Sequence, residues 1–288
     1  MTAASILAAV GSGGLVGFTL GLIGGGGSIL ATPLLLYVVG VANPHIAIGT
    51  GALAVSVNAY ANLASHARKG HVWWRCAIVF SLVGTVGAIL GSSLGLLVDG
   101  KNLLFLFGLV MVAVGLLMLR PRRDTQAEPR RVDVRMCLVT AAVAIATGAA
   151  SGFFGIGGGF LIVPALIFAT GMPTISAVAS SLLAVGTFGL ATALTYAKAG
   201  LVDWPLAAEF ILGGVIGGVF GMLMATRLSR SKSALNRIFA ALVLVVSIYV
   251  ILRNAPSLTW WKLSSTLPEA AVRRAAVIGT AFGLKLRT

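Results

Sequence analysis

Charge is scarce in this chain of 288 residues: only 10% of the residues are charged, and only 7 of them are acidic. Hydrophobic residues make up 58% of the sequence, and the mean hydropathy is +1.01. A soluble globule of this size needs far more polar side chains to cover its surface. The composition therefore excludes a soluble protein and predicts a polytopic membrane protein.

Groups that carry chemistry are equally rare. The two cysteines, Cys76 and Cys137, stand outside any CxxC or Cys/His spacing, so neither a disulfide framework nor a metal site is predicted. The apolar spans contain no metal-ligand cluster and no paired acids, and carboxylates are nearly absent from them. We therefore expect no enzyme activity, no cofactor and no bound metal.

Positive charge dominates the few charged residues, with 21 Lys and Arg against 7 Asp and Glu, a formal net charge of +14. In a soluble protein this excess would indicate nucleic-acid binding. Here the basic residues lie mostly between or after apolar spans, which predicts orientation by positive loops and contact with anionic lipid, with no nucleic-acid partner. No basic residue precedes the first apolar run, so we expect insertion to rely on the helices rather than on a cleaved signal.

The chain repeats itself. GLIGGGGSILATPLL (21–35) aligns with GFFGIGGGFLIVPAL (152–166) at an offset of 131, and from residue 52 the match continues at an offset of 130. A hydrophilic segment, RPRRDTQAEPRRVDVR, separates the two copies. We predict a first repeat at 1–119, a basic cytoplasmic linker at 120–135, a second repeat at 136–252 and a basic C-terminal tail at 253–288.

Each repeat opens with an apolar run that tandem glycines interrupt. Residues 6–40 are too many for one straight span and too few for two full spans with a turn, which predicts two short helices that meet at the glycines. Three full spans should follow in each half, at about 46–66, 74–98, 102–119, 175–197, 204–226 and 234–252. The predicted fold is all-α, with two inverted repeats that each contain a glycine-broken re-entrant hairpin and three transmembrane helices.

Loop charges favour the inversion. With re-entrant hairpins, Arg68, Lys69 and Arg75 share one face with the basic linker and the 227–237 cluster. The opposite face carries Asp99 with Lys101 and Lys198 with Asp203, whose charges cancel. The basic tail opposes this arrangement, because it would lie on the outer side.

The glycine loops are the leading site candidates. A broken helix persists in hydrocarbon only where it is packed in protein or lines a polar cavity, and its free N–H groups and dipole ends suit a small anion. The predicted substrate-binding residues of the loops are Gly24, Gly25, Gly26, Gly27, Ser28, Gly155, Gly157, Gly158 and Gly159. Glycines further along the spans instead predict close helix packing, at Gly84, Gly87, Gly91, Gly214, Gly217 and Gly221.

Polar residues on the helices after the loops are further candidates. Those included as substrate-binding are Thr50, Asn58, Asn62, Ser180 and Ser181. The same side chains can instead bond a neighbouring helix or their own backbone. Glu209, about one turn into its helix, is the one carboxylate in a span and a candidate for proton coupling, with a position at the membrane interface as the alternative.

These paired motifs, GLIGGGGSILATPLL with AIGTGAL and GFFGIGGGFLIVPAL with AVASSLL, resemble those of the sulfite exporter TauE/SafE family up to about residue 250. The resemblance implies a secondary transporter in the bacterial inner membrane that moves sulfite or small organosulfonates, with export as one direction. It also implies a Ser at the position of Gly51. The alternatives are an anion channel of the same architecture and a carrier of another small anion. The substrate, the direction, the coupling ion and the oligomeric state stay open.

Overall fold

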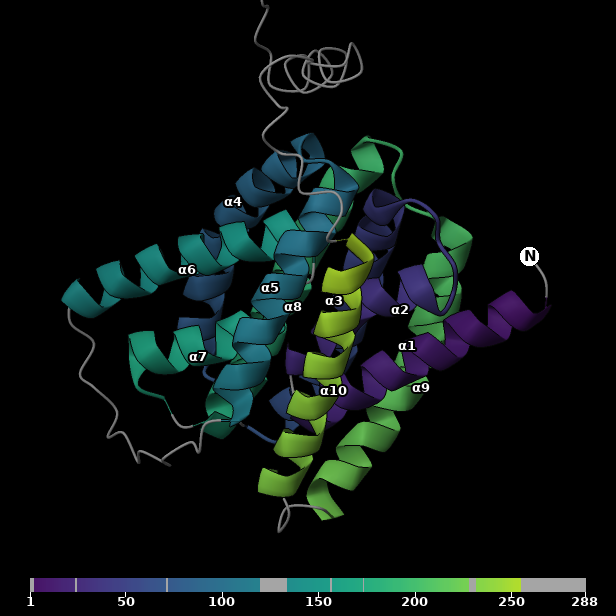
Figure 1. The fold of residues 1–288 in the computed structure, drawn as a ribbon. Coiled ribbons are helices and arrows are strands. Elements are labelled where there is room, and N and C mark those ends of the chain that lie inside the picture. The colour runs from purple at the N-terminus through teal and green to yellow at the C-terminus, as the bar shows by residue number, and fades with distance from the viewer. Residues whose placement is uncertain are drawn as a thin grey trace, which may run out of the picture.

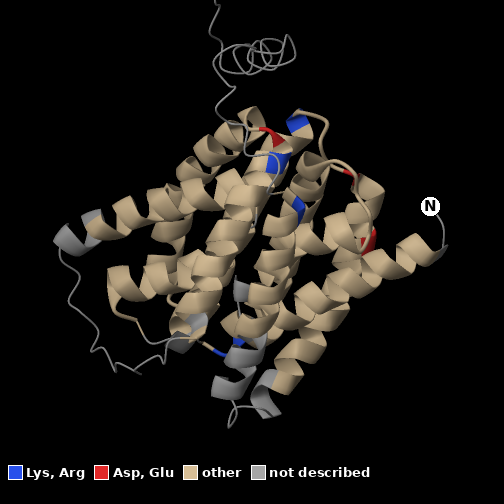
Figure 2. Cartoon of the chain, viewed as in Figure 1, with Lys and Arg blue, Asp and Glu red and all other residues tan. Residues whose placement is uncertain are grey.

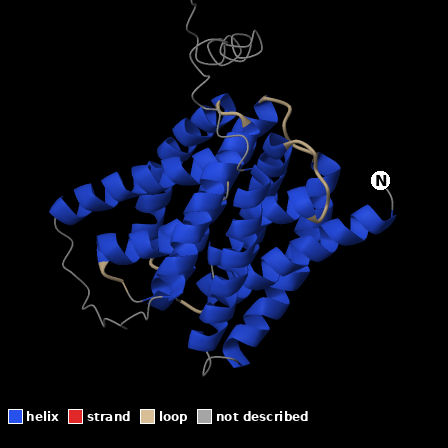
Figure 3. Ribbon diagram, in the orientation of Figure 1, coloured by secondary structure: helices blue, strands red, loops and turns tan. Residues whose placement is uncertain are grey.

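The structure, a computed structural model, describes residues 3–23, 25–70, 72–119, 134–155, 157–172, 174–227 and 232–254. All of its regular elements are helices, and no strand occurs among the described residues (Figures 1 and 3). Most of the predicted linker, at 120–133, and the tail from residue 255 onward lie outside the described part of the chain.

The first half contains α1 Ala3–Ile23, η1 Gly25–Leu30, α2 Ala31–Tyr37, α3 Pro44–Arg68, α4 Trp74–Leu97 and α5 Gly100–Leu119. The second half contains α6 Val134–Phe154, α7 Gly159–Thr170, α8 Thr174–Lys198, α9 Trp204–Arg227 and α10 Lys232–Asn254. Among the described residues, α1, α3, α4, α5, α8 and α9 are long and apolar enough to cross a membrane. The prediction of an all-α membrane protein is therefore confirmed.

Both predicted helix breaks are present. α1 ends at Ile23, a 3₁₀ segment follows it, and α6 ends at Phe154 before α7 begins at Gly159. The hairpin arms, however, are unequal, because α1 and α6 have 21 residues each and only the second arms are short. At about 1.5 Å per residue, 21 residues reach roughly 31 Å, the thickness of a hydrocarbon core. The first arm continues through its glycines because these are used for packing against other helices, as shown below.

The two halves interlock by exchanging partners. α1 packs mainly against α9, and its counterpart α6 packs mainly against α4. The central helices α3 and α8 pack on one another, as do α5 and α10 (Figure 1). These main contacts between the halves thus match when the halves are exchanged, the pattern expected if a two-fold axis relates the repeats.

The central pair α3 and α8 runs antiparallel. Asp203, just beyond the end of α8, donates its backbone N–H to Thr50 Oγ1 near the start of α3, at 3.0 Å. Trp73, just beyond the end of α3, donates its backbone N–H to Ser180 Oγ near the start of α8, also at 3.0 Å. Between them, Ser56 Oγ donates to the Gly186 carbonyl at 2.6 Å. The orientation of each half across a bilayer stays a prediction.

Glycines hold the outer pairs together, as predicted. A Cβ built on Gly217 would collide with the Gly14 carbonyl of α1, and one on Gly87 would collide with the Ile145 carbonyl of α6. Gly91 and Gly221 meet the backbones of α6 and α1 in the same way. Such backbone-to-backbone contact is typical of helix packing in membranes, where small residues allow close approach.

The outer surface is apolar and the described charges lie toward the ends of the bundle (Figure 2). Exposed side chains on α4 and α9 include Leu82, Val86, Leu90, Leu212, Ile216 and Phe220. One end of the bundle, where α3 finishes and α4 begins, carries Arg68, Lys69 and Arg75. The opposite end carries charges of both signs. Lys198 lies there at the end of α8. Asp99 and Lys101 lie there too, because Gly100 between them packs on Pro44 at the start of α3.

Candidate functional site

The second glycine break lies against the central helix crossing. Gly155, Gly157 and Gly158 adopt φ values of +67°, +68° and +65°, which side chains with a Cβ rarely adopt. A Cβ built on Gly157 would lie 3.2 Å from both Val55 Cγ1 of α3 and Val185 Cγ1 of α8. These two valines are equivalent in the repeats, so Gly157 sits where the halves meet.

The first break meets the second. η1 packs against α1, α7 and α8, and Ser28 within it is fully buried. A Cβ on Gly27 would lie 2.6 Å from Thr19 Oγ1, so the segment is pressed against α1. Gly24 lies outside the described residues, and for Gly25 and Gly26 only the 3₁₀ backbone is described. The structure therefore packs η1 against α7, the helix that begins at the second break, and a binding site shared by the two segments stays a prediction.

Two buried hydroxyls beside the breaks were missed by the sequence reasoning. Ser151 is 1% exposed, its Oγ has no hydrogen-bond partner among the described residues, and it would lie 2.6 Å from a Cβ on Gly158. Thr32 is also 1% exposed and its Oγ1 is likewise unpartnered within the described chain. The only sequence feature that could have pointed to these hydroxyls is their place beside the repeated motif. Thr32 precedes the proline of the first copy, and Ser151 precedes the first glycine of the second copy. Unpartnered buried hydroxyls are costly unless something polar reaches them.

The hydroxyls predicted on α3 and α8 have structural partners. Thr50 and Ser180 accept the two loop N–H groups described above, and we call these hydrogen bonds the loop tethers. Ser181 Oγ donates to the Val178 carbonyl of its own helix at 2.8 Å. At the position where the resemblance implies a Ser, Gly51 packs on α2, with a built Cβ 3.2 Å from Leu35 Cδ1.

Asn58 and Asn62 face α9. Both are buried, and the Asn58 carboxamide rests directly on Gly214. Asn62 Nδ2 donates to the Asn58 carbonyl at 2.9 Å and lies 3.0 Å from a Cβ built on Gly218. Sequence spacing placed these residues on one helical face but could not tell which helix that face meets.

Glu209 lies near the start of α9 and is half-buried. Its Oε2 atom is buried and has no hydrogen-bond partner among the described residues. It is distant in sequence from both breaks and belongs to neither, so a role in coupling stays a prediction. Within the described part of the chain, no group of three or more His, Cys, Asp or Glu side chains could hold a metal ion.

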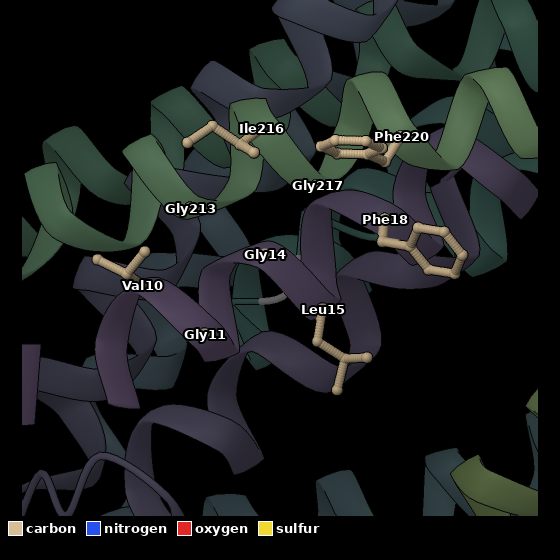
Figure 4. Close-up of a pocket in the computed structure, with 9 residues that line it drawn as sticks. All are labelled: Val10, Gly11, Gly14, Leu15, Phe18, Gly213, Ile216, Gly217 and Phe220. Atoms are coloured by element: carbon tan, nitrogen blue, oxygen red, sulfur yellow. The ribbon is translucent and has the colours of Figure 1, made fainter. Parts of the chain in front are cut away.

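An open groove of about 410 Å³ lies on the outer side of the α1–α9 pair (Figure 4). Its lining consists of glycines and apolar side chains, among them Phe18 and Phe220, and includes none of the predicted site residues. A groove without polar groups cannot replace the hydration of an anion. The lining therefore does not suit an anionic substrate.

A helical bundle with an apolar exterior, two helix breaks in equivalent positions and buried hydroxyls at those breaks is the architecture of a membrane transporter. The sequence matches the family described as "Sulfite exporter TauE/SafE" over residues 9–250. The chain belongs to this family.

Relatives agree with this assignment. A probable membrane transporter protein of Xylella fastidiosa is 68% identical over 259 residues, covering 90% of this chain and 99% of the relative. The probable membrane transporter proteins YjnA and YunE of Bacillus subtilis are 30% and 27% identical, covering 82% and 72% of this chain and 96% and 84% of their own lengths. No solved structure matches the chain. The chain is thus a multi-pass membrane transporter and not an enzyme.

Proposed function

We propose that the protein is a secondary transporter of small sulfur-containing anions, such as sulfite or organosulfonates, in the bacterial inner membrane. The observation that carries the proposal is the meeting of the two glycine-broken segments at the α3–α8 crossing, with the unpartnered hydroxyls of Ser151 and Thr32 beside them. Backbone N–H groups at such breaks bind oxyanions without a buried positive charge. The family's name supports the sulfur anion as substrate.

The arrangement favours alternating access over a fixed pore. α1 and α9 are joined by backbone contact, as are α4 and α6, so each pair can move as one body against the central helices. The loop tethers hold one loop at the start of α3 and the equivalent loop at the start of α8, which lie at opposite ends of the central pair. Opening one end and then the other around a central anion requires only that these pairs rock.

Counterflow in proteoliposomes tests the substrate. Vesicles preloaded with unlabelled sulfite should accumulate labelled sulfite transiently, and sulfoacetate should compete, whereas sulfate and acetate serve as comparison anions. Flux should saturate with concentration, as expected of a carrier. Linear flux without counterflow would favour the channel, and counterflow with acetate alone would move the substrate to another anion class.

The inverted topology has its own test, using equivalent exposed residues in the two halves. Lys69 follows α3 and Ala199 follows α8, 130 residues later. In a variant with both native cysteines replaced by serine, Lys69→Cys should react with an impermeant thiol reagent only from the cytoplasm. Ala199→Cys should react only from outside. Labelling of both from one side would contradict the inversion.

A further inference from the structure

The carboxamide of Asn58 is the least satisfied polar group on the central helices. It is 0% exposed, and neither Nδ2 nor Oδ1 has a hydrogen-bond partner among the described residues. A carboxamide carries two N–H donors and one acceptor oxygen, and burying all of them unpaired costs free energy. Something other than stability must therefore account for an asparagine at this position.

The second repeat shows that packing does not require a polar group there. Phe188 is the repeat equivalent of Asn58, and its ring rests on Gly84 of α4 as the Asn58 carboxamide rests on Gly214 of α9. The ring is fully buried and stacks with Phe80, with centroids 6.2 Å apart. An apolar side chain thus fills the same niche in the same fold without any unsatisfied group.

Two more polar side chains continue from Asn58 along the same face. Asn62 lies opposite Gly218, and Ser65 Oγ donates to Met222 Sδ of α9 at 2.7 Å. We call the row Asn58, Asn62 and Ser65 the α3–α9 seam. It runs from the middle of α3 toward the end that carries Arg68 and Lys69. The equivalent row on α8 is Phe188, Thr192 and Thr195, in which an aromatic ring stands in place of the Asn58 carboxamide and hydroxyls stand in place of Asn62 and Ser65.

We propose that the α3–α9 seam is the route by which the anion passes between the glycine breaks and the basic end of the bundle, with Asn58 donating from Nδ2 to an anion oxygen. This inference rests on the proposed function and assigns its path to the α3–α9 contact, and not to the equivalent contact between α8 and α4. Gly214 and Gly218 present no side chains to the seam, so a small separation of the α1–α9 pair from α3 opens space beside the carboxamides. A neutral N–H donor binds an anion weakly enough to release it, whereas a buried cation would bind the anion more strongly and slow its release.

Two matched variants test the seam by transport. Asn58→Leu removes the unpartnered carboxamide, and Thr192→Val removes a hydroxyl of the α8 row that is also fully buried and unpartnered within the described chain. Asn58→Leu should melt no lower than the wild type yet lose about tenfold in kcat/KM for sulfite, the value of one hydrogen bond to a charged ligand. Thr192→Val should stay within about twofold.

Protection from a thiol reagent gives a second readout that does not depend on the Asn58 variant. Ser65→Cys and its repeat equivalent Thr195→Cys, each in a background without native cysteines, are treated with N-ethylmaleimide. Sulfoacetate should slow modification of Ser65→Cys and leave Thr195→Cys unchanged.

The outcomes separate the two proposals. A wild type that moves none of the sulfur anions defeats the proposed function and the seam with it. A wild type that transports sulfite while Asn58→Leu does so equally well, or while both cysteines are protected alike, overturns the seam and leaves the transporter standing.

Discussion

The two halves of the chain share their backbone contacts and differ in the side chains at the centre. Glycines of α4 and α9 meet the partner backbones at equivalent places in both halves. The inner faces have diverged, because α3 turns Asn58 and Asn62 toward α9 whereas α8 turns Phe188 toward α4. The comparison teaches that backbone contact between helices fixes the scaffold, while the buried side chains that rest on equivalent glycines can differ in polarity.

The largest effect is expected at Gly157, the glycine that lies against both halves. Gly157→Val places a branched side chain at φ +68°, 3.2 Å from Val55 and Val185. We expect sulfite transport to fall by at least about 100-fold, because displacement of the loop removes its N–H groups from the anion. Uptake by folded protein in proteoliposomes checks this. Gly11→Val, at an open position of α1, is the control and should transport normally.

The scaffold glycines sharpen the comparison through stability. Gly87→Val and its equivalent Gly217→Val both drive a side chain into a carbonyl of the facing helix. Each should lower the free energy of unfolding by about 3 kcal/mol or more, with a matching fall in melting temperature in detergent. Equal losses in the two variants are expected. A loss in only one of them would show that the halves are not held together in the same way.

The loop tethers should give smaller and matched effects. Thr50→Val and Ser180→Ala each remove the acceptor of one loop N–H, at a cost of about 1–3 kcal/mol for the group left unpaired. Thr50→Val should loosen the end near Asp203 and Ser180→Ala the end near Trp73, measured as faster hydrogen exchange at those amides. Ser181→Ala, which removes a hydroxyl that donates to the Val178 carbonyl of its own helix, should change neither amide.

The smallest effect is expected at Glu209, which the second half carries where the first half has Val79. Because sulfite itself titrates near neutrality, protons can accompany the substrate without a protein carboxylate. Glu209→Gln should therefore retain most of the pH-dependent sulfite flux. If the variant exchanges sulfite normally but loses all transport driven by a proton gradient, Glu209 is the coupling residue.

The spans and helix breaks were predictable because each rests on local sequence. Apolar length fixed α3, α4, α8 and α9 to within two residues, and tandem glycines located both breaks. The unequal hairpin arms were not predicted. A glycine in an apolar run looks the same in the sequence whether it ends a helix or lets that helix approach another one closely. Gly14 and Gly17 of α1 do the latter.

The candidate site was predictable only in part. Helical spacing grouped Asn58 with Asn62, yet the partner of that face depends on how α9 crosses α3, which no local pattern encodes. Thr50 and Ser180 were predicted to bind substrate; in the structure they accept N–H groups from loops of the opposite half, which no local pattern indicates, and their role toward substrate stays a prediction. Ser151 was overlooked because a single serine in a glycine-rich run carries no signal until the fold buries it.

The location of a bound anion tests the central claim most directly. Crystals of the protein without its native cysteines, soaked in selenite, the selenium analogue of sulfite, would show the anion by anomalous scattering. The account predicts one peak between η1 and the start of α7, within hydrogen-bond reach of the Gly157–Gly159 backbone and Ser151. A peak only at the basic end of the bundle, or only between α5 and α10, would contradict it.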